Sequence, residues 1–152
     1  MPKSQIRVIV HATDFSSGSR AAFSKAVQLA RGAGAQLVLL HVRAPVASLV
    51  ADAYVAPQEY EQLDRASLDG AKKQITRLVD AARKRGVRAK GQIVDGVAHE
   101  QILRGARRAK ADMLVLGSHG RSRLARFFLG SVAGRVASLA TCPVLTVRGP
   151  RR

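Results

Sequence analysis

Short apolar runs alternate with helical stretches along the whole of this 152-residue chain, and this alternation restricts the fold more than any other feature of the sequence. The apolar runs are rich in β-branched side chains and bounded by turn residues, which predicts strands. We expect these strands at residues 6–11, 36–42, 87–93, 112–116 and 143–147. Apolar residues at helical spacing predict helices at residues 19–33, 58–85, 97–110 and 130–139.

Strands that take turns with helices in this way are typical of a mostly parallel sheet covered by helices on both faces. The run at 87–93 alternates apolar with polar side chains, so this strand is expected nearer a sheet edge. Residues 43–57 lack clear periodicity and are interpreted as a long connection. The length fits one domain, taken as residues 1–152. Such sheets bind ligands beyond the carboxyl ends of their strands, where the strand order reverses, so the loops after the first and fourth strands are the places to search.

A strongly basic composition points to anionic partners. The chain has 26 Lys and Arg against 10 Asp and Glu, a formal net charge of +16, and residues 83–152 alone hold 16 basic and 3 acidic residues. Phosphate esters, nucleic acid and an anionic membrane surface are the partner classes that such an excess favours. The single cysteine, Cys142, excludes an internal disulfide framework and a cysteine-rich zinc site. No apolar run approaches the roughly 18 residues of a membrane span, and no signal-peptide pattern is present, so a cytoplasmic location is expected.

The loop after the fourth expected strand combines two features that bind anions. Gly117 and Gly120 let backbone N–H groups approach a ligand closely, and Gly130 and Ser131 open a helix whose free N–H groups and positive dipole end favour negative charge. Three arginines lie between these glycines, at Arg121, Arg123 and Arg126. The loop therefore predicts a site for a polyphosphate. The alternative is that Gly117 merely ends a strand and that Ser131 only caps a helix.

The loop after the first expected strand carries Asp14. A carboxylate at the carboxyl end of a strand can accept a hydrogen bond from a ribose hydroxyl or a base amine. The alternative is that Asp14, Ser16 or Ser17 caps the following helix. Because a parallel sheet brings Asp14 and the glycine loop to the same edge, the functional interpretation gains weight.

Three stretches of the chain resemble the universal stress protein family. They are Thr13-Asp14-Phe15-Ser16, Leu40-His41-Val42 and the whole of residues 112–148. The pattern Gly-x2-Gly-x9-Gly-[Ser/Thr], the nucleotide-binding signature of that family's ATP-binding branch, is complete at Gly117, Gly120, Gly130 and Ser131. The resemblance implies a Rossmann-like three-layer α/β sandwich: a five-stranded parallel sheet of order 3-2-1-4-5 with helices on both faces.

The same resemblance implies ATP, with Mg2+ or Mn2+, at the carboxyl edge of the sheet. It implies that the adenosine end contacts Ala12, Thr13, Asp14 and Val42. It implies that the phosphates are held by Gly117, Gly120, Gly130, Ser131 and Val132, with Leu116 and Arg121 in the same cofactor-binding set. It also implies a homodimer in which the last strand, Val144–Val147, pairs with its mate, as an unpaired edge strand readily does.

We therefore expect an ATP-binding universal stress protein that acts as a stress-response sensor or regulatory module. Turnover is expected to be slow or absent, because no obvious general base other than Asp14 accompanies the glycine loop, and no catalytic residue is assigned. The four histidines show no metal-ligand spacing, so protein ligands for a metal stay open.

Two alternatives remain from the residues alone. The first is a basic nucleic-acid-associated protein of the same fold, drawing on Arg83-Lys84-Arg85 and on Arg104, Arg107 and Arg108. The chain has no Trp, four Phe and two Tyr, so stacking platforms are scarce and contacts with anionic partners are expected to be weak, non-specific and salt-dependent. The second is a slow nucleotide phosphohydrolase.

Overall fold

The computed structural model describes residues 5–119 and 129–149. In chain order its elements are β1 Val8–Ala12, α1 Ser17–Ala33, β2 Gln36–Arg43, α2 Val46–Leu49, α3 Pro57–Lys84, β3 Ala89–Asp95, α4 Ala98–Ala109, β4 Met113–Gly117, α5 Ser131–Leu139 and β5 Val144–Val147. Each expected strand and helix is present within a few residues of its predicted bounds. No helix in the described residues has an apolar stretch long enough to cross a membrane.

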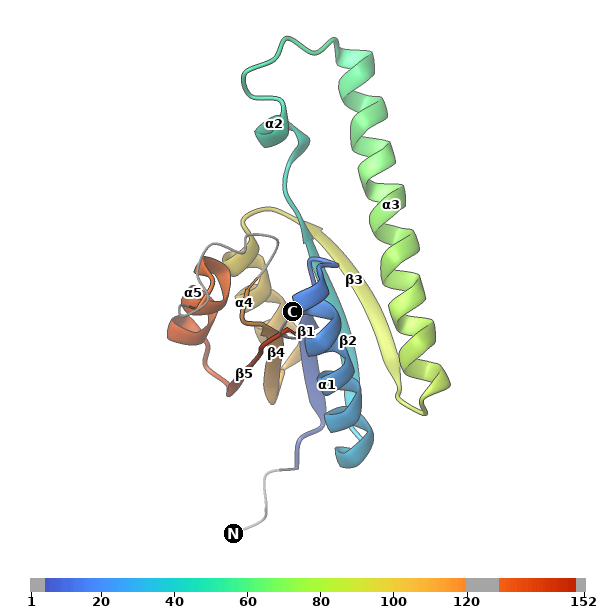
Figure 1. Cartoon of the computed structure of the whole chain (residues 1–152), viewed down its shortest axis with the longest axis vertical. Helices are drawn as coiled ribbons and strands as arrows, with labels where there is room; N and C mark the ends of the chain where they lie inside the picture. The colour runs from blue at the N-terminus through green and yellow to red at the C-terminus, as the bar shows by residue number, and fades with distance from the viewer. Residues whose placement is uncertain (1–4, 120–128, 150–152) are drawn as a thin grey trace.

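The five strands form one sheet of order β3-β2-β1-β4-β5, and every neighbouring pair is parallel (Figure 1). This is the order that the sequence resemblance implied. Val10 of β1 lies opposite Val38 of β2 on one side and Leu114 of β4 on the other. The strand order reverses between β1 and β4, so the carboxyl ends of these two strands mark the place where a ligand is expected in a sheet of this kind.

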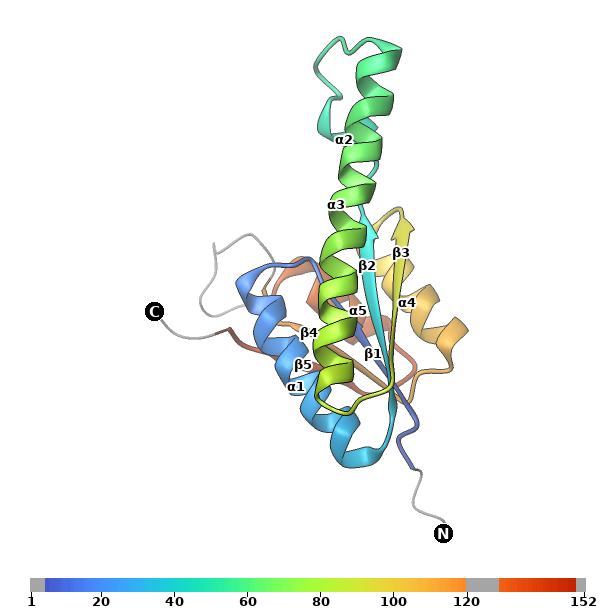
Figure 2. The ribbon, with the colours of Figure 1, turned by 90° about the vertical axis from the view of Figure 1, so that its right-hand side faces the viewer.

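Helices cover both faces of the sheet because alternate side chains of each buried strand point to opposite sides. On one face, α1 and α3 bury Phe23, Ile75 and Val79 against strand residues such as Ile9. On the other face, α4 and α5 cover a second cluster of strand residues (Figure 2). Burial of each large aliphatic side chain stabilises the fold by about 1.5–3 kcal/mol, so these two clusters set the strand register.

The connection after β2 differs from expectation, because it contains the short helix α2. Val46 begins that helix and is buried, whereas the remaining α2 residues are not. Helix α3 then starts with Pro57 in its first turn, where the missing N–H of proline costs nothing. No residue of α3 before Ala71 is buried, so the first half of this 28-residue helix extends past the sheet. We call residues 46–69, which project from the body in Figures 1 and 2, the arm.

Candidate functional site

Three glycines bring separate chain segments into backbone contact at the carboxyl edge of the sheet. A Cβ placed on Gly18, in the first turn of α1, would lie 2.8 Å from the His119 carbonyl oxygen. A Cβ on Gly117 would lie 3.2 Å from the carbonyl carbon of Gly18, and one on Gly149, beyond β5, 3.4 Å from the Gly18 Cα. Sequence analysis selected Gly117 for ligand approach and missed Gly18 and Gly149. The structure gives all three a further role, which is to let α1, β4 and β5 meet.

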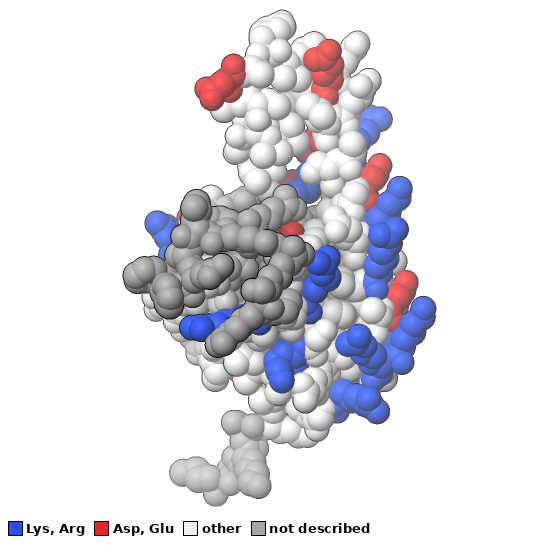
Figure 3. Space-filling view, in the orientation of Figure 1, with Lys and Arg blue, Asp and Glu red and all other residues white. Residues whose placement is uncertain are grey.

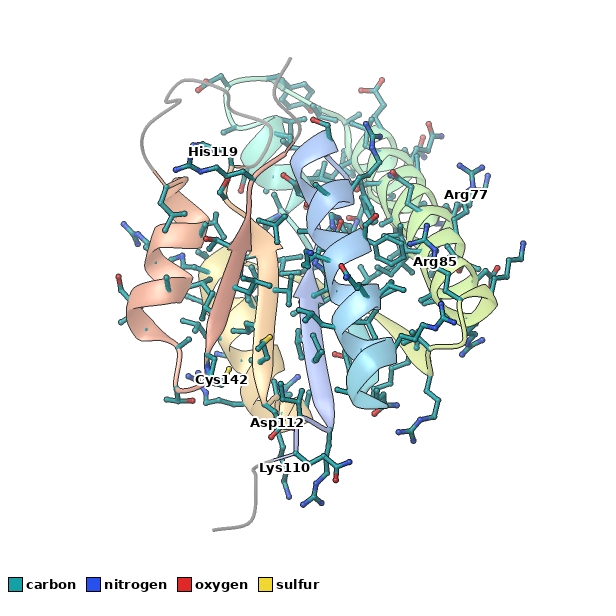
Figure 4. All side chains as sticks on the ribbon, turned by 60° about the horizontal axis from the view of Figure 1, so that its bottom comes forward. Arg77, Arg85, Lys110, Asp112, His119 and Cys142 are labelled. Carbon is teal, nitrogen blue, oxygen red and sulfur yellow. The ribbon has the colours of Figure 1, made fainter. Side chains whose placement is uncertain are left out.

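Gly130 fixes the start of α5 to the end of β4. Its N–H donates to the Ser118 carbonyl over 2.7 Å, and a Cβ at this position would lie 3.0 Å from the same oxygen. Ser118 in turn donates its N–H to the Val147 carbonyl over 2.9 Å. His119 lies beside the start of α5 at this edge, far from Cys142 and Asp112 at the other end of the sheet (Figure 4). These bonds place the amino end of α5 at the carboxyl ends of β4 and β5.

The amino end of α5 has no capping side chain among the described residues. Gly130 is the N-cap residue and makes no side-chain capping hydrogen bond, so Ser131 is the first helical residue and does not cap it. The alternative that Ser131 is only a cap is therefore wrong. The N–H groups of the first turn have no acceptor inside the helix, and the Ser131 side chain is exposed. Backbone donors, a hydroxyl and the positive end of the helix dipole are groups that favour an anion.

Asp14 shapes the turn between β1 and α1. Its Oδ1 accepts hydrogen bonds from the Ser16 N–H over 2.9 Å and from the Ser19 hydroxyl over 2.7 Å. The capping role falls to Ser16, whose hydroxyl accepts from the Ser19 N–H. The start of α1 is thus capped by a side chain, whereas the start of α5 has no capping side chain in the described part of the chain. Asp14 is half-buried at the same edge of the sheet.

Phe15 holds this turn in an uncommon backbone conformation. Its φ of 63° lies in the left-handed region, which costs a bulky residue roughly 1–2 kcal/mol. The Phe15 ring packs on His41, with ring centroids 4.3 Å apart, and the His41 Nδ1 donates to the Thr13 carbonyl over 2.8 Å. The turn that follows β1 is therefore held from β2. Sequence analysis gave neither ring a role, because their contact joins residues 26 positions apart.

Arg43 joins three elements beside this edge. Its Nε and Nη2 donate to the two carboxylate oxygens of Asp95 over 2.8 and 2.9 Å, and its Nη1 donates to the Asp64 carboxylate over 2.8 Å. The bonds to Asp95 and then to Asp64 raise the pKa of this guanidinium, although burial works against the charge. Arg43 is 8% exposed and was missed by sequence analysis, where a charged residue at the end of an apolar run was the available signal.

His11, in β1, is buried in its neutral form. It is 0% exposed in β1; its Nδ1 donates to the Val115 carbonyl over 3.0 Å, and its Nε2 has no hydrogen-bond partner among the described residues. Burial lowers its pKa from 6.5 to about 4, against smaller opposite effects of the Val115 carbonyl and the Asp14 charge. The imidazole is therefore neutral at physiological pH.

Cys142 lies at the opposite, amino edge of the sheet. It is partly buried beside a cavity of about 220 Å3 that Leu103 and Leu114 also line. Burial raises the pKa of its thiol, which disfavours the thiolate that a nucleophile needs.

The structure brings most of the predicted site residues to one edge. These are Ala12, Thr13, Asp14, Val42, Leu116, Gly117, Gly130, Ser131 and Val132. Gly120 and Arg121, with Arg123 and Arg126, lie outside the described residues. In the part of the chain that the structure describes, no three His, Cys, Asp or Glu side chains gather as metal ligands would.

The sequence model of the universal stress protein family matches residues 5–148. This chain belongs to that family. It is 33% identical over 141 residues to the universal stress protein YxiE of Bacillus subtilis, a match that covers 90% of this chain and 95% of YxiE. The fold agrees with that of MJ0577 from Methanocaldococcus jannaschii at a TM-score of 0.83 and 25% identity, covering 97% of this chain and 99% of the other. A universal stress protein solved in complex with cAMP matches at a TM-score of 0.68 and 26% identity, covering 95% and 98%.

Proposed function

We propose that this protein binds an adenine nucleotide, ATP in the first place, and acts as a stress-response regulatory module with slow or no hydrolysis. The observation that carries the proposal is the amino end of α5, which no described side chain caps and which lies at the carboxyl end of β4, beside the point where the strand order reverses. The first-turn N–H groups and the Ser131 hydroxyl would donate to phosphate oxygens there. The complete glycine signature around this helix start supports the same assignment.

The adenosine end would lie against the ends of β1 and β2. Asp14 would accept a hydrogen bond from a ribose hydroxyl, while Ala12, Thr13 and Val42 would contact the nucleoside from the strand ends. The cAMP complex of a family member with 26% identity supports an adenine nucleotide as the ligand class. The choice of ATP rests on the glycine signature.

The donor set fits a nucleotide that arrives with its own cation. The Ser131 hydroxyl is exposed, and no three His, Cys, Asp or Glu side chains of the described residues gather as metal ligands would. Mg2+ or Mn2+ would thus be held mainly by phosphate oxygens and water. The ion would supply neutralisation of phosphate charge.

The engagement of Asp14 supports slow or absent hydrolysis. A general base must reach the attacking water within hydrogen-bond distance. Oδ1 of Asp14 already accepts from Ser16 and Ser19, which makes it a structural and binding group. Occupancy of the site, instead of turnover, would then carry the signal.

A homodimer through β5 is part of the proposal. Strand β5 lies at one edge of the sheet, and its four residues are all partly exposed. A second copy's β5 would satisfy the unpaired N–H and C=O groups of that edge.

Calorimetric titration with ATP, ADP, AMP and cAMP in the presence of Mg2+ tests the site. Ser131→Ala removes the hydroxyl alone and is expected to weaken ATP binding about threefold to tenfold. Ser131→Pro removes the N–H as well, and proline is well tolerated at the first helical position, so the fold is kept while binding falls more than about tenfold. Ser24→Ala, at an exposed position of α1, is the matched control.

Wild-type protein that takes up no adenine nucleotide would overturn the proposal, and so would Ser131→Pro that binds as tightly as wild type. Phosphate release over a long incubation measures turnover separately. Rapid phosphate release would be consistent with the proposed binding site but would contradict the proposed regulatory function.

A further inference from the structure

Charge is divided between the two ends of helix α3. The arm, residues 46–69, holds five of the ten acidic residues of the chain and one basic residue, Arg65. The stretch from 70 to 90 holds eight basic residues and one acidic residue, Asp80. We call this second stretch the basic foot; its charged residues are Lys72, Lys73, Arg77, Arg83, Lys84, Arg85, Arg88 and Lys90. Figure 3 shows acidic side chains at the top of the arm and basic ones along the lower part of the helix.

These charges are mostly available to a partner. Within the described residues, the salt bridges are the two that Arg43 makes with Asp64 and Asp95. The charged residues of the basic foot are all exposed, and Arg77 and Arg85 are labelled on this part of the helix in Figure 4. The helix dipole favours acids in a first turn and bases in a last turn only. It does not account for charges in the middle of α3.

The order of the charges is reversed about the centre of the helix, between Lys72 and Lys73. Glu61 and Lys84 lie at equal distances on either side of this point, and so do Arg65 and Asp80. At 1.5 Å rise per residue, Arg65 and Asp80 are about 22 Å apart in one copy and cannot meet there. Two antiparallel copies of α3 would place each of these residues opposite its counter-charge, and a two-fold axis would form every pair twice.

An apolar contact accompanies the ionic ones. Tyr54, at the tip of the arm, is 97% exposed. At the other end of α3 lies a hollow of about 390 Å3, lined by Arg83 and Arg88, by Gln36 and Gly86, and by the mostly buried Val87 and Ala89. Both arginines are held by backbone carbonyls, Arg83 by Ala89 and Arg88 by Gly34. A tyrosine ring fits an apolar wall flanked by fixed guanidinium groups, because the ring face attracts cations.

We infer that a second copy of this chain docks antiparallel along α3, with the arm of each copy on the basic foot of the other and Tyr54 in the hollow. Helix α3 packs over β2 and β3, at the sheet edge opposite β5, so this pairing is compatible with a β5 dimer. Lys72 and Lys73 of the two copies approach one another at the axis, and Asp69, one turn away in each copy, offsets their repulsion. The inference does not depend on nucleotide binding.

A charge swap measured by sedimentation velocity at low salt tests the pairing. Arg65→Asp and Asp80→Arg, both at exposed positions, each turn two attractive pairs into repulsive ones and are expected to weaken the association about tenfold or more. The double variant restores both pairs and is expected to return within about threefold of wild type. Rescue is diagnostic because the two residues cannot touch within one copy. Association through β5, if it occurs, is expected to be the same in wild type and in the charge-swap variants.

A cysteine trap gives a second measurement. In a Cys142→Ser background, Lys73→Cys lies beside the proposed axis and is expected to form a disulfide-linked dimer on oxidation. Ser24→Cys, exposed on α1, is the control and is expected to stay monomeric on a non-reducing gel. Equal trapping at both positions, or reversals whose effects add without rescue, would overturn the inference. Binding of an RNA duplex to the foot of a chain that does not self-associate would overturn it in favour of a nucleic acid.

Discussion

The buried neutral histidine of β1 gives a quantitative prediction about acid stability. His11 has a pKa of about 4 in the folded protein against 6.5 in the unfolded chain. Between these values the unfolded chain binds a proton that the folded protein excludes, so the free energy of unfolding falls as the pH is lowered through this window. A difference of 2.5 pKa units corresponds to about 3 kcal/mol in full, and about 2.5 kcal/mol of it is lost between pH 7.5 and 4.5.

The measurement is urea unfolding followed by circular dichroism at a series of pH values, comparing wild type with His11→Asn. An asparagine amide keeps a donor for the Val115 carbonyl but does not titrate. Other titrating groups are shared by the two proteins, so the difference between their pH profiles isolates His11. Wild type is expected to lose about 2.5 kcal/mol more than the variant over this range. Profiles that stay parallel within about 0.5 kcal/mol would refute the reasoning.

Three further substitutions, two around the site and one in α3, are each tested by the urea midpoint. Gly18→Ala forces a Cβ against the His119 carbonyl and is expected to destabilise by about 1–3 kcal/mol, whereas Gly70→Ala, with open space beside it in α3, is expected to stabilise by about 0.5–1 kcal/mol. Arg43→Met removes the bonds to two carboxylates and is expected to cost about 2 kcal/mol; an unchanged midpoint would show that the three elements hold together without it.

Local patterns predicted the sheet and its helices, because the spacing of apolar residues along the sequence reveals which face of a strand or helix is buried. Helix α2 and the projection of the arm from the body were missed for the converse reason. Residues 43–57 have no apolar period, and the first half of α3 has no burial to encode. The strand order itself came from the family resemblance, since periodicity does not say which strands are neighbours.

Part of the candidate site could likewise be predicted from local sequence, and part could not. The glycine signature and Asp14 are visible as local motifs, and the structure brings their described members to one edge. The contacts of Gly18 with His119, and of Arg43 with Asp95, join residues 101 and 52 positions apart, so local sequence did not reveal them. ATP as the ligand and the cytoplasm as the location stay predictions of the sequence.

The Arg43 guanidinium has a mechanical consequence. It is planar and bonds to β3 and α3 from the end of β2, so these three elements are pinned at one point. The Arg43 side chain follows Val42, which would contact the proposed nucleoside, and it bonds to Asp64 of the arm. Because Asp64 belongs to the arm, this guanidinium also ties the arm to the sheet at the end of β2.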